Sequence, residues 1–123
     1  MIIENSFIQN FDDAVAVKTS NQLSKYSPCS QNITIRNMVI HYSVGATIGS
    51  VTPHPSVSCI RNVTFQNVTF HEAIKAVYIK SNPGNHGTGI IDSIVYDNIN
   101  VQGSIWYPIW IGLANCLPGS LLL

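Results

Sequence analysis

The sequence predicts an all-β solenoid of parallel strands, with about four coils of roughly 31 residues each. Three observations support this fold class. Two independent series of short segments recur every 30 to 32 residues. Both series alternate apolar and polar residues with the period of a strand, and no segment shows the apolar stripe of an amphipathic helix. The repeats would therefore stack as rungs, about 4.8 Å apart.

The first series centres on an asparagine with an apolar residue two positions before it. Its members are Asn5, Asn37, Asn67 and Asn98. An asparagine at the same point of every coil predicts a stacked ladder of side-chain amides at a turn. The in-register aliphatic residues on either side would fill the interior of the solenoid.

The second series lies between the members of the first. Its reference apolar positions are Val17, Ile48, Ile79 and Ile111. Together the two series predict a partial β-helix over residues 1–112 and an atypical C-terminal tail over 113–123. A leucine-rich repeat is the main competing architecture, but its repeats are shorter, about 20–29 residues, and its leucine signature is missing from the sequence.

Composition limits the partners of this chain. Its 123 residues suit one domain, and charged residues make up 10%, with six Lys and Arg against six Asp and Glu. Such a chain has no basic surface for nucleic acid or an anionic membrane, so we expect neither partner, and we expect a monomer. No segment reaches the roughly 20 apolar residues of a membrane span, and the start lacks the pattern of a secretion signal.

Cysteines, histidines and sequons give weaker signals. The three cysteines have no metal-binding spacing, and their odd number leaves at least one unpaired within the chain: Cys29, Cys59 and Cys116. The histidines show no metal-site spacing either, so we expect no metal and no cofactor: His41, His54, His71 and His86. Three Asn-x-Thr sequons would accept N-glycans on a eukaryotic secretory route: Asn32, Asn62 and Asn67.

Two adjacent carboxylates, Asp12 and Asp13, precede the first alternating segment of the second series. Neighbouring carboxylates repel each other, and such a pair can hold one proton near neutral pH, as general-acid chemistry requires. The alternative is a turn, because short polar side chains also bond to their own backbone at strand entries.

Aligning the second series predicts which residues share a column. It places Asp13 in line with Val44, Lys75 and Tyr107, and Lys18 in line with Gly49, Lys80 and Gly112. One face would then carry the carboxylates at one end and Tyr78, Lys80 and Trp110 one to three coils away. Aromatic rings pack on sugar rings and a lysine attracts an acidic sugar, so this face predicts a polysaccharide site. The alternative is that Tyr78 and Trp110 are wall residues.

The loops that follow the second series would project at one edge and form a cleft wall. They cover residues 19–30, 51–58 and 81–88. Varied polar residues, proline and glycine are typical of such loops.

Three segments resemble, in order and spacing, the signature blocks of the polygalacturonase-type glycoside hydrolases of family 28. Asn10–Lys18 is similar to Gly-Asp-Asp with its following strand, Val44–Ser50 to Gly-His-Gly with an Ile-Gly-Ser strand, and Val77–Gly84 to Arg-Ile-Lys with a Pro-Gly turn. The resemblance covers about residues 2–112. It implies a right-handed parallel β-helix, secreted from the cell, that hydrolyses pectic α-glycosidic bonds with inversion.

By this resemblance, Asp12 is the general acid that protonates the leaving oxygen, and Asp13 helps to activate water. Inversion needs one protonated and one ionised carboxyl group, with water between them. Lys80 matches the lysine that binds a substrate carboxylate. The alignment of the second series adds Tyr78 and Trp110 as further predicted substrate-binding residues.

The sequence also departs from the family pattern. The histidine position is Val44 and the arginine position is Tyr78, while a third aspartate would precede Met1. We therefore expect a fragment of a longer helix with two open ends. In a regular strand, Asp12 and Asp13 would point to opposite faces unless a bulge re-aims one of them.

Two other functions fit the predicted fold. A non-catalytic β-helix that binds polysaccharide or a surface partner is favoured by the changed histidine and arginine positions. A polysaccharide lyase would need a calcium cluster and an arginine base, and Arg36 and Arg61 are the only arginines.

Overall fold

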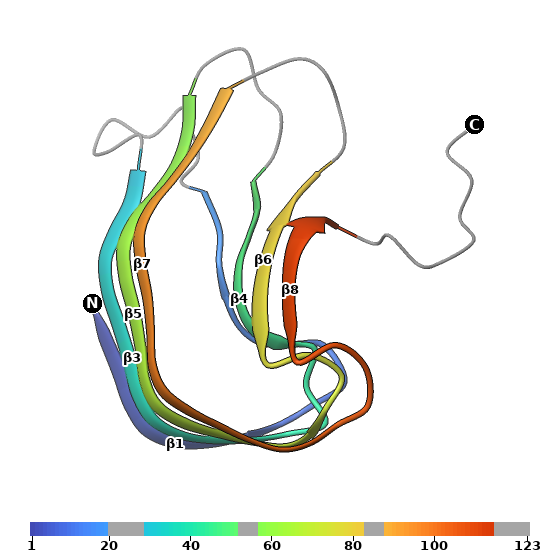
Figure 1. Ribbon diagram of the computed structural model, residues 1–123. Helices are drawn as coiled ribbons and strands as arrows, with labels where there is room; N and C mark the ends of the chain where they lie inside the picture. The colour runs from blue at the N-terminus through green and yellow to red at the C-terminus, as the bar shows by residue number, and fades with distance from the viewer. Residues whose placement is uncertain (20–28, 52–56, 83–87, 115–123) are drawn as a thin grey trace, which may run out of the picture.

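The computed structural model describes residues 1–19, 29–51, 57–82 and 88–114 (Figure 1). Within these ranges the chain forms eight strands and no helix. The strands are β1 (Ile2–Gln9), β2 (Asp13–Val17), β3 (Cys29–His41), β4 (Gly45–Val51), β5 (Val57–Ala73), β6 (Val77–Ser81), β7 (Thr88–Ser104) and β8 (Ile109–Leu113). Most of the predicted C-terminal tail and most of the three predicted loops lie outside the described residues.

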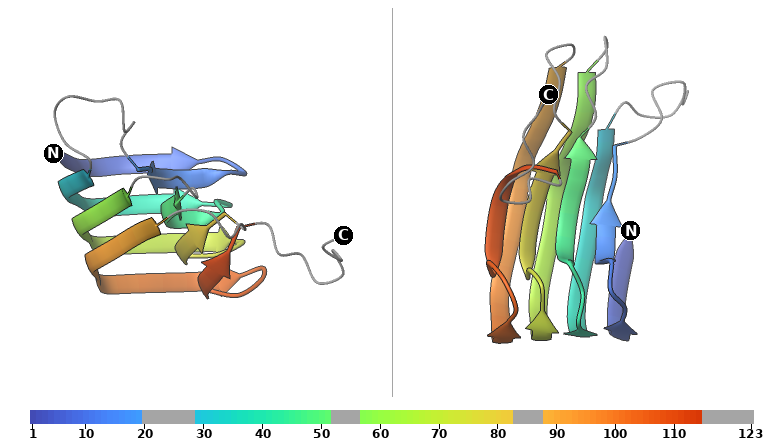
Figure 2. Two further views of the ribbon diagram at one scale, coloured as in Figure 1. Left: turned by 90° about the horizontal axis from the view of Figure 1, so that it is seen from above. Right: turned by 90° about the vertical axis from the view of Figure 1, so that its right-hand side faces the viewer.

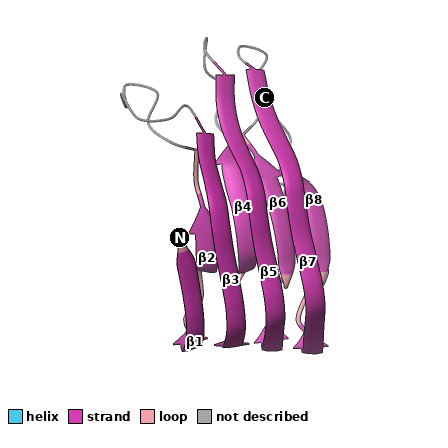
Figure 3. Ribbon diagram, turned by 90° about the vertical axis from the view of Figure 1, so that its left-hand side faces the viewer, coloured by secondary structure: helices cyan, strands magenta, loops and turns pink. Residues whose placement is uncertain are grey.

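Alternate strands belong to two different sheets. The long strands form a parallel sheet in the order β1-β3-β5-β7, and the short strands form a second parallel sheet in the order β2-β4-β6-β8 (Figures 1 and 3). Seen from above, each long strand passes to the short strand of the same coil, and the coils stack side by side (Figure 2). The predicted right-handed parallel β-helix is confirmed.

The predicted alignment of the second series is also confirmed. Val17 pairs with Ile48, Ile48 with Ile79, and Ile79 with Ile111. These residues align because a slip of one position would move the buried side chains of a strand to the opposite face.

The long sheet bends at a column of left-handed residues. The four asparagines of the first series have φ angles of 55°, 55°, 52° and 53° in chain order. Asparagine tolerates this conformation better than most residues. Asn37 Nδ2 donates to Asn5 Oδ1 at 3.1 Å, Asn67 Nδ2 to Asn37 Oδ1 at 3.2 Å, and Asn98 Nδ2 to Asn67 Oδ1 at 2.6 Å. The predicted amide ladder is therefore present.

The core fills the two middle coils. Ile35 and Phe65, which pair in the long sheet, are both fully buried, as are Ile48 of the short sheet and Phe70. Tyr96 continues the column that contains Phe65, and their rings stack with centroids 4.8 Å apart. Aligned apolar residues thus fill the interior, as predicted.

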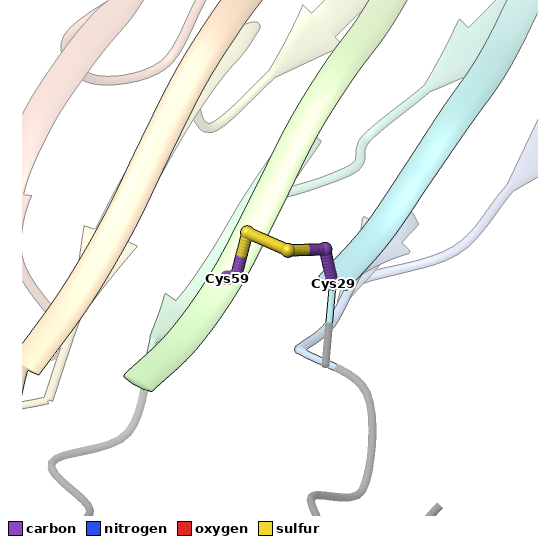
Figure 4. Close-up of a disulfide and its surroundings, with 2 residues drawn as sticks. All are labelled: Cys29 and Cys59. Atoms are coloured by element: carbon purple, nitrogen blue, oxygen red, sulfur yellow. A yellow bond between two sulfur atoms is a disulfide. The ribbon is translucent and has the colours of Figure 1, made fainter. Parts of the chain in front are cut away.

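One disulfide joins two adjacent coils. Cys29 and Cys59 are direct partners of β3 and β5, with Cα atoms 4.4 Å apart, and their sulfur atoms are bonded (Figure 4). Cys116 lies outside the described residues. Since the described residues contain no helix, they contain no helical segment long and apolar enough to cross a membrane.

Candidate active site

The link between β1 and β2 places the two predicted catalytic aspartates. Asn10 anchors this link, because its backbone N–H donates to the His41 carbonyl at 3.3 Å and its side-chain Nδ2 donates to the Asp13 carbonyl at 3.1 Å. Asp12 is exposed, and its Oδ1 accepts a 2.7 Å hydrogen bond from the Asp13 N–H. Asp13 begins β2 and is partly buried. The two carboxylates therefore have different surroundings.

A bulge in β2 corrects one predicted column. Asp13 pairs with Gly45, not with Val44, and the next pair joins Val15 to Ala46. Ala14 is thus an extra residue on the β2 side of the ladder. The Val44 N–H instead donates to the Asp12 carbonyl at 2.9 Å. The prediction assumed uninterrupted alternation, and a bulge both shifts the register and re-aims the side chains beside it.

The Asp13 carboxylate accepts two bonds from the neighbouring coils. Thr47 Oγ1 on β4 donates to its Oδ1 at 2.8 Å, and Lys80 Nζ on β6 pairs with its Oδ2 at 2.7 Å. Only 10% of the Asp13 side chain and 12% of the Lys80 side chain are exposed. Both oxygens of the Asp13 carboxylate thus accept a hydrogen bond, one from a hydroxyl and one from an ammonium group.

Glycines let β4 approach the segment that carries Lys80. Gly49 has a φ angle of 106°, and a Cβ atom there would collide with the Lys80 carbonyl oxygen. Gly45 has a φ angle of 133°, and a Cβ atom would lie 2.9 Å from the Ala76 carbonyl oxygen. These positions need glycine for both space and backbone conformation.

Tyr78 and Trp110 are neighbours in the short sheet, where Tyr78 also pairs with Thr47. Tyr78 is only 2% exposed, and its ring centroid lies 4.6 Å from Lys80 Nζ. Its ring therefore faces a lysine and offers little surface to solvent. Trp110 is partly exposed and stacks on Trp106, with ring centroids 5.3 Å apart.

Lys75 adds a second cation to this region. It lies just before β6, is 6% exposed, and its Nζ is 3.8 Å from the centroid of the Tyr78 ring. The pKa of Lys75 is lowered, first by burial and then by the charge of Lys80, while Asp13 acts in the opposite direction. The charges of both Asp13 and Lys80 thus affect the pKa of Lys75.

The structure thus brings Asp13, Thr47 and Lys80 together on the short sheet, and Asp12 lies next to Asp13 in the link before β2. Sequence reasoning missed Thr47, Lys75 and Trp106 as site residues. The predicted alignment held a signal for Lys75, because it placed that lysine in line with Asp13. Lys80 pairs with Gly112 as predicted. Within the described ranges, no three His, Cys, Asp or Glu side chains gather in a way that would hold a metal ion.

The chain was compared with known proteins. The sequence model for glycosyl hydrolases family 28 matches residues 1–117. An exopolygalacturonase of Cochliobolus carbonum is 30% identical over 114 residues, which cover 83% of this chain and 24% of the relative. A probable exopolygalacturonase C of Neosartorya fischeri is 33% identical over 110 residues, covering 89% of this chain and 22% of the relative.

A probable endopolygalacturonase D of Neosartorya fischeri is 32% identical over 109 residues, covering 89% of this chain and 20% of the relative. The chain thus spans about a quarter or less of the length of these curated relatives. No solved structure is significantly similar to it. The family match extends over the whole described β-helix, and the chain belongs to glycosyl hydrolases family 28.

Proposed function

We propose that this chain carries the acid/base carboxylates of a glycosidase that hydrolyses a pectin-type polysaccharide with inversion. The observation that carries the proposal is that two adjacent aspartates differ in exposure and in hydrogen-bond partners. Asp13 accepts bonds from Thr47 and Lys80, while Asp12 stays exposed beside it. An inverting glycosidase needs two carboxyl groups in different protonation states.

In the proposed mechanism, Asp12 is the general acid. Its exposed carboxyl group reaches the leaving glycosidic oxygen and gives it a proton. Asp13, whose carboxylate contacts Lys80, is the base that draws a proton from the attacking water. Lys80 Nζ contacts Asp13 Oδ2 at 2.7 Å. If Lys80 also binds a substrate carboxylate, as predicted, its ammonium group would contact both carboxylates.

Tyr78 and Trp110 would complete the substrate site in different ways. The buried Tyr78 ring supports the lysine ammonium groups, and a ring face next to a cation holds it by electrostatic attraction. Trp110 keeps part of its surface free for a sugar ring.

The test is release of reducing ends from polygalacturonate by the full chain and by Asp12→Asn and Asp13→Asn variants. Each substitution keeps the side-chain shape but removes the acid or base, so we expect a loss of roughly 10²–10⁴-fold in rate. Asp92→Asn is the matched control, since Asp92 is an exposed aspartate on β7, in the other sheet. An Asp12→Asn variant that folds and keeps the full rate would refute the acid role.

A non-catalytic carbohydrate-binding β-helix is the second candidate. It is favoured by Val44 and Tyr78 at the positions where the family pattern has histidine and arginine. The same assay separates the two functions. Binding of the polysaccharide with no reducing ends released from it would support the binding protein and exclude the hydrolase.

We also propose that the protein works outside the cell, as a monomer whose partner is the polysaccharide and which binds neither nucleic acid nor membranes. The Cys29–Cys59 disulfide supports this location, because disulfides persist in oxidising compartments. We further propose that residues 1–112 act as one β-helical unit and 113–123 as a tail, although Leu113 itself is the last residue of β8. Detection of the protein only in the cell fraction of its source would contradict the proposed location.

A further inference from the structure

We propose that Lys75 is a substrate-anchoring residue whose ammonium group binds the carboxylate of an acidic sugar, on an aromatic platform formed by Trp106 and Trp110. This subsite would lie toward the C-terminal coil from Asp13. The inference rests on the proposed function for its ligand class, although its test measures binding and not hydrolysis.

The first observation is that Lys75 has no acidic partner. Two ion pairs occur among the described residues, Arg36 with Glu4 and Lys80 with Asp13, and neither includes Lys75. Lys75 Nζ also makes no hydrogen bond within these residues. Lys75 as a residue is only 6% exposed, and its ammonium group has no carboxylate beside it.

The second observation is the aromatic surroundings of this ammonium group. Lys75 Nζ lies 3.8 Å from the centroid of the Tyr78 ring, 4.7 Å from that of Trp106 and 5.4 Å from that of Trp110. Ring faces attract a cation but do not accept its protons as oxygen atoms do. The rings thus hold the ammonium in place and leave its donors available for an oxygen ligand.

The third observation is the division of charge between the two lysines. Lys80 is neutralised by Asp13, at 2.7 Å. Burial and the charge of Lys80 lower the pKa of Lys75, and the charge of Asp13 opposes this shift. Among the described residues no carboxylate pairs with Lys75, and a bound sugar carboxylate would supply that anion.

The fourth observation identifies a sugar as the carrier of that carboxylate. Trp106 and Trp110 stack with an interplanar angle of 27°, Tyr107 packs against both, and all three keep part of their surface accessible. Partly exposed indole rings beside a lysine ammonium group suit a pyranose ring that bears a carboxylate. The geometry thus points to a uronic acid unit.

The experiment is calorimetric titration of the full chain with trigalacturonate and with the same trisaccharide methyl-esterified on its carboxyl groups. In Lys75→Met, we expect affinity for the acid trisaccharide to fall about tenfold, as for loss of one charge-assisted hydrogen bond, and affinity for the ester to change less than twofold. Lys75→Arg should retain most of the preference for the acid. Arg36→Met is the control, because Arg36 is an exposed cation on β3, in the other sheet, where it pairs with Glu4.

A folded Lys75→Met variant that binds the acid trisaccharide as tightly as the wild type would overturn the inference. So would a wild-type chain that does not bind the acid form. A chain that binds it through Lys75 but releases no reducing ends would support the subsite and refute the proposed hydrolase.

If Lys75→Met does not fold, wild-type protein labelled with ¹³C at lysine Cε gives the answer. The Lys75 signal, assigned from the Lys75→Arg spectrum, should shift on saturation with the acid trisaccharide and not with the ester. An unmoved signal would overturn the inference.

Discussion

The two sheets carry ion pairs of nearly equal length in very different surroundings. On the long sheet, Arg36 Nε and Glu4 Oε2 are 2.6 Å apart, and their side chains are 43% and 38% exposed. On the short sheet, Lys80 Nζ and Asp13 Oδ2 are 2.7 Å apart, and their side chains are 12% and 10% exposed. Water screens the charges of the first pair far more than those of the second. Only the second pair should therefore have a large interaction energy between its two side chains.

The sheets also differ in regularity. No register shift interrupts the ladders of the long sheet, whereas the short sheet has shifts after Asp13 and between Ile48 and Val51. Both irregularities flank residues of the candidate site. The regular sheet therefore supplies the frame and much of the core, and the irregular sheet departs from the repeat where charged side chains must meet.

The largest expected effect comes from disturbing the irregular sheet at Gly49. Gly49→Ala adds backbone strain of roughly 1–3 kcal/mol at a positive φ angle and a collision with the Lys80 carbonyl, for a total loss of roughly 2–4 kcal/mol. Urea unfolding of the full chain measures it. Gly103→Ala is the control, because φ is 76° there but the nearest atom to the added Cβ is 3.7 Å away. Equal losses in the two variants would show that close packing on Lys80 is unimportant.

The amide ladder of the long sheet should contribute less. Asn67→Ala removes the bonds to Asn37 and Asn98 and puts alanine at a φ angle of 52°, which together should cost roughly 2 kcal/mol. Asn67→Gly removes the same bonds but accepts the conformation, so it should lose only about 1 kcal/mol. Chemical denaturation compares the two. If the glycine variant is as unstable as the alanine variant, backbone conformation is not what asparagine provides at this bend.

Tyr96 links the two sheets, and its replacement should cause the smallest loss of stability at neutral pH. Its hydroxyl donates to the Ala46 carbonyl at 2.9 Å, and its loss in Tyr96→Phe should cost about 1 kcal/mol. Burial raises the pKa of Tyr96 above its ordinary value of 10.0. The folded state therefore holds this proton more tightly than the unfolded state.

This contribution of Tyr96 is complete below pH 10.0 and decreases as the pH rises above it, by up to about 1.4 kcal/mol per pH unit. Tyr96→Phe lacks this decrease, so the stability difference between wild type and variant should shrink above pH 10.0 and then reverse. Unfolding free energies measured from pH 7 to pH 11 check the sign. A constant difference across this range would contradict the burial of the hydroxyl.

Repetition explains what the sequence predicted well. The alignment of Val17, Ile48 and Ile79 and the asparagine ladder follow from residues that recur once per coil, because stacked strands bring equivalent positions together. Asp12 and Asp13 stand out as candidates because two adjacent carboxylates are conspicuous in a chain with few charges.

Departures from the repeat explain what the sequence missed. Nothing in the alternation around Ala14 signals a bulge, so Asp13 was aligned with Val44 although it pairs with Gly45. The proximity of Lys75 and Lys80 depends on the side-chain conformations of these lysines. A pattern of residue types along the sequence does not specify those conformations. The Cys29–Cys59 pairing likewise remained open, because three cysteines allow several pairings.

A double-mutant cycle tests most directly that the short sheet brings Asp13 and Lys80 together as a coupled pair. Urea unfolding would be measured for wild type, Asp13→Asn, Lys80→Met and the double variant, with a parallel cycle on Glu4 and Arg36. We predict a coupling energy of roughly 1–3 kcal/mol for the buried pair and at most about 1 kcal/mol for the exposed one. Equal coupling in the two cycles, or none between Asp13 and Lys80, would contradict the account.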